Sequence, residues 1–374
     1  MKTLAIIVLT LFPIVASADW PFRGPDHNSI VKTDFKPASE PIQIWKAEVG
    51  AGHSSCIVAG GKVFTIGDSQ LQALDAKSGE LLWKKDVANT WGAPTHFEGK
   101  VYTLGGVTPP VAACYSAETG EEIWRLQLPK TVCAKEYFHC SPPLIWEDLI
   151  ILNAGGGTAV KRDTGELVWN HPGIAGMAPT VVCELNGKTA VAIFGGERCV
   201  FRDPRSGDEL TSIPWKGEDP TTAADPLFFE NKVLLSSAYG AGRALFDLTA
   251  NPPSEIWAKR GADVGHTWAS TISIGGELYG FTKSAFICID AESGEAKWER
   301  PSLAGSVTIL GDYALVLTEK GELHIGKLTP DEPFESSLIA QLSGGKTWSL
   351  PAYHEGNFVI RNDKGEVFCW KIES

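Results

Sequence analysis

Aromatic and imidazole side chains recur at one position of a repeated sequence unit. Six units align on the first residue of an apolar segment, at Val63, Val101, Leu149, Val233, Leu278 and Phe358. Ten residues earlier stand His53, Trp91, His139, Ala223, Trp268 and Trp348, and His266 lies two residues before Trp268. Indole faces stack on flat rings or sugars, and imidazoles bind metals or polarise a polar group. The pattern predicts a ligand-binding ring formed by His53, Trp91, His139, His266, Trp268 and Trp348.

The same residues also have a purely structural interpretation, in which the rings fill a channel and stack on each other. A transition-metal site would need three histidines to converge to within about 2.1 Å of one ion, and we expect no bound metal. Asp225 is the one carboxylate placed near the aligned position. The chain contains no Gly-x-Ser-x-Gly and no His-Glu-x-x-His motif, and we expect no catalytic residues.

Two of the eight cysteines stand apart from the repeated strands. Cys133 and Cys140 flank a seven-residue step in a long connection and approach His139. In an exported protein they could form a disulfide, or they could remain two thiols. The other cysteines fall mainly within strand segments, where a small thiol packs as an apolar residue.

The elements that position these residues follow from a repeated phrase. It reads Asp-Ala-Lys-Ser-Gly-Glu-Leu-Leu-Trp at 75–83 and Asp-Ala-Glu-Ser-Gly-Glu-Ala-Lys-Trp at 290–298. Six copies end in tryptophans 41 to 46 residues apart, a period typical of propeller blades with four short strands each. The Asp can cap the amides of the turn, and the Gly tolerates positive φ. We expect the closing tryptophans to dock on the next blade: Trp45, Trp83, Trp124, Trp169, Trp215, Trp257 and Trp298.

Counting the units predicts an all-β, eight-bladed propeller of four-stranded antiparallel blades over 41–374. A seventh unit at about 303–341 lacks the tryptophan, and an eighth runs out after three strands. Residues 41–46 read as a strand with a closing tryptophan and no unit before it. Pairing this N-terminal strand with the C-terminal strands closes the ring and removes open edges. Residues 19–40 are predicted to form an extended N-terminal arm.

The N-terminus and the charge limit where the protein works. Residues 1–18 combine Lys2, an apolar stretch and an Ala-Ser-Ala site, as in a cleaved signal peptide. No cysteine follows that site, so we expect a periplasmic or secreted, soluble protein without a lipid anchor. A net charge of −12 argues against binding to nucleic acid or to anionic lipid, because both require a basic surface. We also expect no membrane insertion and a monomer.

The Asp-Ala-x-Ser/Thr-Gly-Glu-x-x-Trp phrase resembles the PQQ-like, tryptophan-docking repeat of eight-bladed quinoprotein propellers. The Trp-Pro-Phe-Arg-Gly-Pro segment at 20–25 resembles the start of many exported proteins with this repeat. One implied function is that of quinoprotein dehydrogenases, which hold pyrroloquinoline quinone and Ca²⁺ at the channel mouth. The other is that of the BamB-like propellers of outer-membrane assembly, which are non-enzymatic scaffolds of about this size.

The sequence departs from both groups. It lacks the adjacent cysteine pair of the quinoprotein alcohol dehydrogenases and their long insertions, and it also lacks the lipid-anchor cysteine of the BamB-like proteins. We therefore expect an exported, non-enzymatic binding or scaffold propeller that engages a protein or a small ligand at one face, without a cofactor. The alternatives are an oxidoreductase that uses the quinone with Ca²⁺ and a carbohydrate-binding propeller.

Overall fold

The computed structural model describes residues 19–37, 40–133, 139–261, 263–265, 268, 270–342 and 344–372. These residues form strands and turns, without any helix in the described part of the chain. No helix there is long and apolar enough to cross a membrane. The expected signal peptide, residues 1–18, lies outside the described residues.

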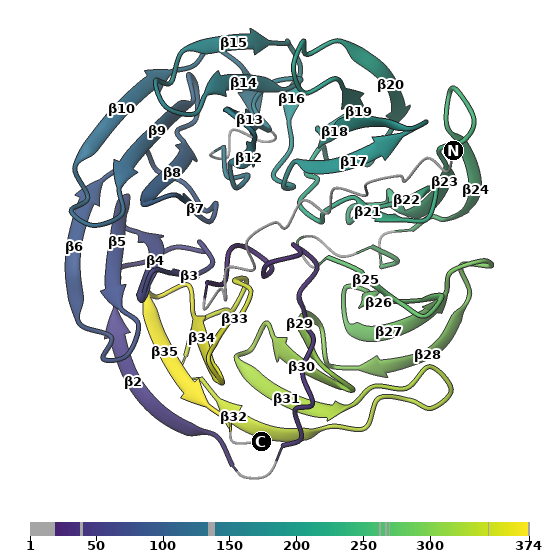
Figure 1. Ribbon diagram of the computed structural model, residues 1–374. Helices are drawn as coiled ribbons and strands as arrows, with labels where there is room; N and C mark the ends of the chain where they lie inside the picture. Colours follow the sequence, from purple (N-terminus) through teal and green to yellow (C-terminus); the bar gives the residue numbers. More distant parts are fainter. Residues whose placement is uncertain are drawn as a thin grey trace, which may run out of the picture.

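Eight four-stranded antiparallel sheets are arranged around one axis as the blades of a propeller (Figure 1). Blades 1 and 2 consist of β3 (Ile57–Ala59), β4 (Lys62–Gly67), β5 (Gln70–Asp75) and β6 (Leu81–Asp86), followed by β7 (Thr95–Phe97), β8 (Lys100–Gly105), β9 (Val111–Ser116) and β10 (Glu122–Gln127). Blades 3 and 4 consist of β12 (Leu144–Trp146), β13 (Leu149–Leu152), β14 (Thr158–Lys161) and β15 (Leu167–Asn170), followed by β17 (Val181–Leu185), β18 (Lys188–Phe194), β19 (Arg198–Arg202) and β20 (Glu209–Pro214).

The second half of the ring repeats this meander. Blades 5 and 6 consist of β21 (Leu227–Phe229), β22 (Lys232–Ser237), β23 (Gly242–Asp247) and β24 (Ser254–Lys259), followed by β25 (Ile272–Ile274), β26 (Glu277–Phe281), β27 (Ala285–Asp290) and β28 (Ala296–Pro301). Blade 7 consists of β29 (Gly305–Leu310), β30 (Tyr313–Thr318), β31 (Glu322–Lys327) and β32 (Ser337–Gln341). Between blades, β11 (Val132–Cys133) pairs in parallel with β16 (Ile174–Ala175).

Blade 8 confirms the predicted closure of the ring. Its three C-terminal strands are β33 (Ala352–His354), β34 (Asn357–Arg361) and β35 (Glu366–Lys371), and the fourth is the N-terminal β2 (Ile42–Glu48). β2 and β35 pair antiparallel, with Trp45 opposite Cys369. The two ends of the chain therefore share one sheet, which leaves no blade with an unpaired third strand.

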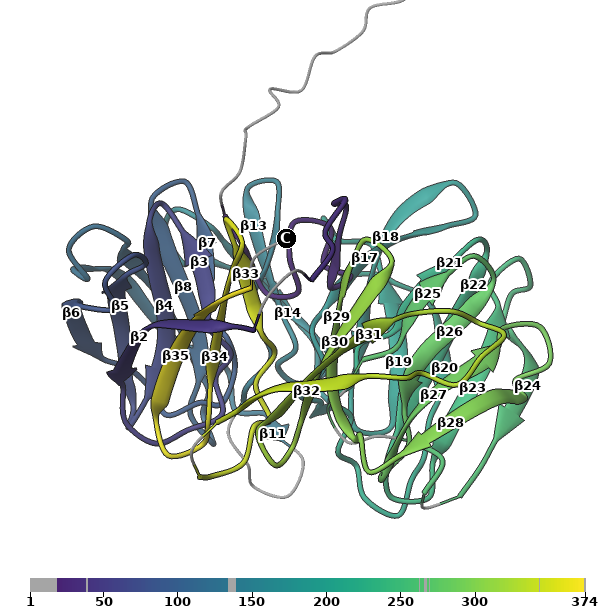
Figure 2. The same ribbon diagram turned by 90° about the horizontal axis from the view of Figure 1, so that it is seen from below.

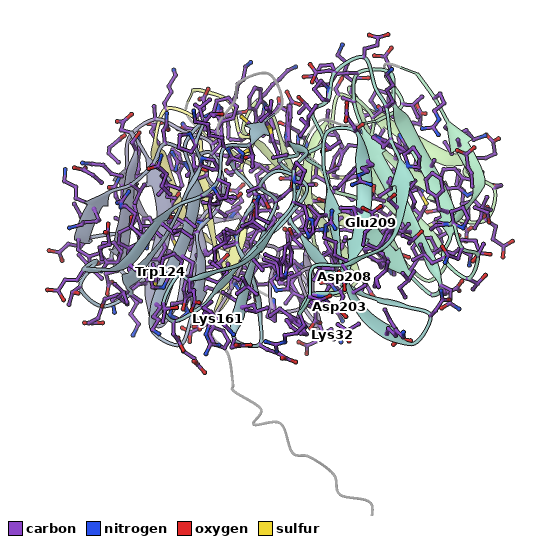
Figure 3. The ribbon with its side chains drawn as sticks, turned by 90° about the horizontal axis from the view of Figure 1, so that it is seen from above. Lys32, Trp124, Lys161, Asp203, Asp208 and Glu209 are labelled. Carbon is purple, nitrogen blue, oxygen red and sulfur yellow. The ribbon has the colours of Figure 1, made fainter. Side chains whose placement is uncertain are left out.

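The meander gives the ring two distinct faces. Turns between the first and second strands of each blade, and between the third and fourth, lie at one face, here called the hairpin face. The links from one blade to the next, and the turns between second and third strands, lie at the other, the link face. In the side view, Asp203 and Asp208 of one such hairpin turn lie in the same half of the ring as Lys32 of the N-terminal arm (Figure 3). The arm therefore leaves the ring on the hairpin face.

The repeated tryptophans hold adjacent blades together at the rim. Trp83 Nε1 donates to the Ala117 carbonyl oxygen of the next blade at 3.1 Å. Its ring lies over Gly120, where φ is +70° and a Cβ atom would stand 2.6 Å from the indole. Only glycine permits both this backbone conformation and this approach. The same donation to a carbonyl oxygen of the following blade is made by Trp45, Trp124, Trp169, Trp257 and Trp298.

Trp215 departs from the predicted common pattern. It lies just beyond β20, and its Nε1 donates to the Ser237 hydroxyl oxygen at 2.9 Å rather than to a turn carbonyl. In blade 4 the residue at the docking position, opposite Phe201 beside the bulge, is Thr211. Trp215 follows it by four residues and therefore contacts a different part of blade 5.

The Asp of the repeated phrase caps its turn as predicted. Asp75 Oδ1 accepts hydrogen bonds from the Ser78 amide at 2.8 Å, the Ser78 hydroxyl at 3.0 Å and the Lys77 amide at 3.0 Å. The bonds from Ser78, above all its amide, lower the pKa of Asp75 because they favour the charged form.

The N-terminal arm fills part of the central channel, a placement that its sequence alone did not indicate. Trp20 and Val58 of the innermost strand β3 exchange two backbone hydrogen bonds. The short strand β1 (Ile30–Val31) then pairs in parallel with β29 on the channel side of blade 7. In Figure 1 the purple arm lies at the centre of the ring and then runs outward over β29 to the start of β2, and Figure 2 shows its coil near one face.

Candidate functional site

A cavity of about 270 Å³ lies on the axis of the ring. Five of the six residues at the aligned position, all except His139, line it together: His53, Trp91, Ala223, Trp268 and Trp348. They converge because each stands on a link that carries the chain from the rim of one blade to the innermost strand of the next. An equivalent position in successive blades of a ring faces the same axis.

The aromatic rings form a contiguous cluster along the cavity wall. The rings of His53 and Trp348 stack, with centroids 4.6 Å apart and planes 26° apart. Trp268 lies 4.5 Å from Trp348, and Trp91 meets the edge of His53 at 4.9 Å. The rings thus stack on each other, as the structural interpretation requires, and still leave an open volume beside them.

Hydroxyl groups next to two of the tryptophans fix their backbone. Thr90 Oγ1 donates to the His139 carbonyl oxygen at 2.9 Å and accepts from the Gly92 amide at 3.0 Å, on either side of Trp91. After Trp348, Ser349 Oγ donates to the Arg361 carbonyl oxygen at 2.8 Å. These tryptophans therefore stand on anchored links.

His53 is uncharged at neutral pH. Burial is the main cause that lowers its pKa; Arg361 and Lys346 lower it further, while Asp363 opposes them. Two buried nitrogen atoms of the cluster, His53 Nδ1 and Trp348 Nε1, have no hydrogen-bond partner among the described residues. Buried polar groups are normally paired, so these atoms mark a place where a ligand or water can bind.

His139 does not belong to the cavity wall, contrary to the sequence prediction. Its ring is buried in the link, with Nε2 3.0 Å from Thr131 Oγ1 and Nδ1 3.1 Å from the Gly106 carbonyl oxygen. The next residue, Cys140, lines the cavity instead. His266 lies outside the described residues. Within the described ranges, no group of three or more His, Cys, Asp or Glu side chains could hold a metal ion.

Cys133 and Cys140 are both buried and are described as thiols rather than as a disulfide. Burial raises the pKa of Cys140 to about 12, and Cys133 adds to the shift. The sequence left a disulfide and two thiols as alternatives, and the structure has two thiols. The Cys140 thiol lines the cavity and is uncharged at neutral pH.

Asp225 is engaged in holding the N-terminal arm. It forms a buried ion pair with Arg23, and each side chain is less than a tenth exposed. Its other oxygen accepts a hydrogen bond from Ser270 Oγ at 2.9 Å. A carboxylate paired on both sides is not available as a general base, and its role here is to anchor the arm.

Phe22 is a wall residue that the repeat analysis could not find, because it lies outside every repeat. It stands between Trp20, which pairs with β3, and Arg23, which pairs with Asp225, and it lines the cavity. The Trp20 ring lies over Gly24, where φ is +82° and a Cβ atom would be 2.7 Å from the indole. The density of aromatic, Pro and Gly residues at 20–25 was the one available signal of a packed segment.

Comparison with known proteins now places the chain. The family described as "Outer membrane protein assembly factor BamB" (PQQ_2) matches residues 31–106 and 67–300, well over half of the sequence. The chain belongs to this BamB family. The BamB proteins of Burkholderia pseudomallei and Xanthomonas campestris are 23% and 25% identical over 91% and 90% of this chain, and over 90% and 87% of their own lengths.

Solved structures agree on the fold. BamB from Moraxella catarrhalis superimposes with a TM-score of 0.67 at 16% identity, over 90% of this chain and 98% of that one. The quinohemoprotein alcohol dehydrogenase from Comamonas testosteroni gives a TM-score of 0.52 at 13% identity, over 95% of this chain and 80% of that one. At these identities the likeness extends to the propeller alone, because one fold carries many functions.

The cavity of this BamB-family chain has a composition suited to binding rather than to metal-assisted chemistry. Its wall combines indole, phenyl and aliphatic groups with a few polar atoms, among them the hydroxyl oxygens of Ser55, Thr221 and Tyr239. Ca²⁺ takes six to eight oxygen ligands, usually including carboxylates. No Asp or Glu in the described part of the chain lines this cavity, and the nearby Asp225 is paired with Arg23.

Proposed function

We propose that this protein is an exported, non-enzymatic scaffold that binds another protein, in the manner of an outer-membrane protein assembly factor. The observation that carries the proposal is the extent of the match to such factors, about nine-tenths of this chain and of the Burkholderia relative. The match thus covers most of both proteins.

The link face is the better candidate for the partner. Three large apolar side chains are exposed there around the channel: Val107 at 37%, Val132 at 60% and Tyr239 at 40%. Val107 and Tyr239 lie in turns between second and third strands, and Val132 lies in the link after blade 2. Exposed apolar groups on one face favour a protein contact. At the centre of the hairpin face, the arm already occupies the corresponding space.

The proposal is tested by charge substitution in the native host. The host lacking this protein is complemented with the wild type, with the double variant Val107→Asp/Val132→Asp, or with Leu338→Asp. Leu338 is also an exposed apolar residue, at 55%, but it lies on the outer strand β32. We expect the wild type and Leu338→Asp to restore the amount of folded outer-membrane β-barrel protein and the double variant to fail. Loss of the protein without any effect on these β-barrels would exclude the function.

The quinoprotein alternative rests on the axial aromatic cavity and on the shared propeller fold. Indole rings can stack on a quinone, and Trp348 and Trp268 would form the stacking surface. Ca²⁺ needs several oxygen ligands, and no carboxylate of the described residues lines the cavity. We therefore propose that the protein works without the quinone and its Ca²⁺. Titration with pyrroloquinoline quinone, with and without Ca²⁺, is the test. Stoichiometric binding with dye-linked oxidation of an alcohol would favour the enzyme.

A further inference from the structure

The axial cavity is closed on one side by the protein's own N-terminal arm. Asp19 Oδ1 accepts a hydrogen bond from the Gly60 amide in the first hairpin turn, so the arm enters from the hairpin face. Trp20 follows, paired with Val58, and Phe22 then reaches the cavity. After Phe22 the chain turns back through Ser29 to β1 beside blade 7. The cavity therefore lies between Phe22 and the links, and a ligand enters from the link face.

The position of Phe22 is held by contacts with three separate parts of the ring. The double backbone bridge of Trp20 joins blade 1, and the ion pair of Arg23 with Asp225 joins the link before blade 5. Arg23 Nε also donates to Ser29 Oγ at 3.2 Å, and the Ile309 amide of blade 7 donates to the Ser29 carbonyl oxygen at 2.8 Å. Phe22 is thus a fixed end wall.

The volume of the cavity and its aromatic wall favour a small planar ligand. An engineered apolar cavity of about 150 Å³ is enough to bind benzene, and this cavity measures about 270 Å³. One or two fused rings would fill it. Indole and phenyl faces surround the space, and aromatic rings prefer offset-stacked or edge-to-face partners.

The polar and charged groups near the cavity determine which charge of the ligand is favoured. Trp348 Nε1 is a donor only, and it is buried without a hydrogen-bond partner among the described residues. Lys346 Nζ lies 4.9 Å from the centre of the Trp348 ring. Among the residues that the structure describes, no carboxylate lines the wall to balance a cationic ligand. An acceptor group, above all an anionic one, satisfies the indole N–H and faces the positive side chain.

We infer that the axial cavity binds a small aromatic carboxylate of one or two fused rings, and that Phe22 sets the maximum size of the ligand. The indole faces hold the ring system, Trp348 Nε1 donates to the carboxylate, and Lys346 lies near the same group. Val107 and Val132, which test the proposed protein contact, do not line this cavity, so either assignment can fail without the other.

Calorimetric titration of the purified protein tests the inference with three probes that share one ring system. These are indole-3-propionate, neutral indole and the cation tryptamine. We expect indole-3-propionate to bind with 1:1 stoichiometry and at least about tenfold more tightly than tryptamine, with indole between them. A tenfold ratio corresponds to about 1.4 kcal/mol. Absence of binding by all three probes at millimolar concentration, or preference for tryptamine, would overturn the inference.

Two variants locate the site. Trp348→Phe keeps a ring and removes the N–H donor, and we expect it to weaken indole-3-propionate binding about tenfold while indole binding changes little. The control is Trp370→Phe. Trp370 is also half-buried, and its buried Nε1 likewise lacks a hydrogen-bond partner among the described residues, but it lies on β35 away from the cavity. Equal effects of the two substitutions would refute the assignment.

The role of Phe22 is tested by size. Phe22→Ala opens the end wall, and we expect it to admit anthracene-9-carboxylate, a three-ring acid that the wild type excludes. Binding of this acid by the wild type would remove the size limit ascribed to Phe22. N-acetyltryptophanamide, a neutral mimic of a protein side chain, is the last probe. If it bound more tightly than indole-3-propionate, the cavity would accept a partner's side chain, and the small-molecule assignment would be wrong.

Discussion

The rim and the axis of this propeller both use tryptophan, but in different surroundings. At the rim, five tryptophans lie on a glycine of the next blade and donate their N–H to a carbonyl oxygen there: Trp45, Trp83, Trp124, Trp169 and Trp257. At the axis, Trp348 stacks on His53 and Trp268, and its buried N–H has no hydrogen-bond partner among the described residues. A tryptophan whose ring and N–H are both engaged stabilises the fold, whereas the axial arrangement retains an unused donor beside an open volume.

Residue type alone therefore does not separate structural from functional tryptophans in a repeat protein. The rim tryptophans share one place in the repeat phrase, and the axial ones share another, ten residues before the second strand. The two groups differ in what completes their hydrogen bonds. Four measurements bear on this distinction, and the expected change in stability decreases from one to the next.

Removal of the closing strand should have the largest effect. A protein starting at Gly50 lacks both the arm and β2, which leaves β35 as an unpaired edge. A protein starting at Pro41 lacks only the arm. We expect the first to lose cooperative thermal unfolding, followed by circular dichroism, and the second to retain it with a lower Tm. Similar thermal unfolding of the two proteins would show that the pairing of β2 with β35 contributes little to stability.

Breaking the ion pair between the arm and the axis comes next. Arg23→Met leaves Asp225 charged and buried, and removal of one partner of a buried pair costs about 3–5 kcal/mol. The double variant Arg23→Met/Asp225→Leu removes both charges and should recover part of that loss. Urea denaturation measures the free energy of unfolding. A double variant less stable than Arg23→Met would mean that the pair does not act as a unit.

The third prediction compares the two kinds of tryptophan directly. Trp124→Ala removes an indole that lies over Gly165 and its 3.0 Å hydrogen bond to the Arg162 carbonyl oxygen, and Figure 3 shows Trp124 on the outer side of the ring. We expect a loss of about 3 kcal/mol, the lower end for emptying a large aromatic site. Trp348→Ala should cost clearly less, because a cavity already lies beside it. If urea denaturation gave equal losses of unfolding free energy for the two variants, Trp348 would stabilise the fold as the rim tryptophans do.

The smallest effect should be a loss of stability below neutral pH. Burial lowers the pKa of His53, His96, His139, His171 and His324. The unfolded chain therefore takes up protons near pH 6.5 before the folded chain does, so stability falls as the pH drops below that value. We expect Tm to decrease by a few degrees from pH 7.5 to 5.5, with a flatter dependence in His139→Gln. A Tm that increased as the pH was lowered from 7.5 to 5.5 would contradict the predicted direction of the pH dependence.

Most of the rim could be predicted because its information is local. The turn phrase contains the cap, the glycine and the tryptophan within ten residues, and its recurrence fixes the number of blades. The exception is Trp215, which lies four residues after Thr211, the residue at the docking position of blade 4. This offset is also visible when the copies of the phrase are aligned. The closing role of residues 41–46 followed from counting strands.

The axis could be predicted only in part. Repeat alignment correctly brought His53, Trp91, Trp268 and Trp348 to one place, since equivalent positions of a ring share an axis. It misplaced His139, because the direction of a side chain depends on its hydrogen bonds, here to Thr131 and Gly106. It also missed Phe22, which belongs to no repeat.

By itself, therefore, the sequence determined the eight blades, their closure and the family, because these depend on short-range patterns that repeat along the chain. Tertiary structure alone decided which polar groups are satisfied and what closes the cavity. The pairing of Arg23 with Asp225 joins residues 202 positions apart, and the bridge of Trp20 to Val58 joins the arm to the channel wall. No local pattern encodes such contacts, because they arise only when the ring has formed around the arm.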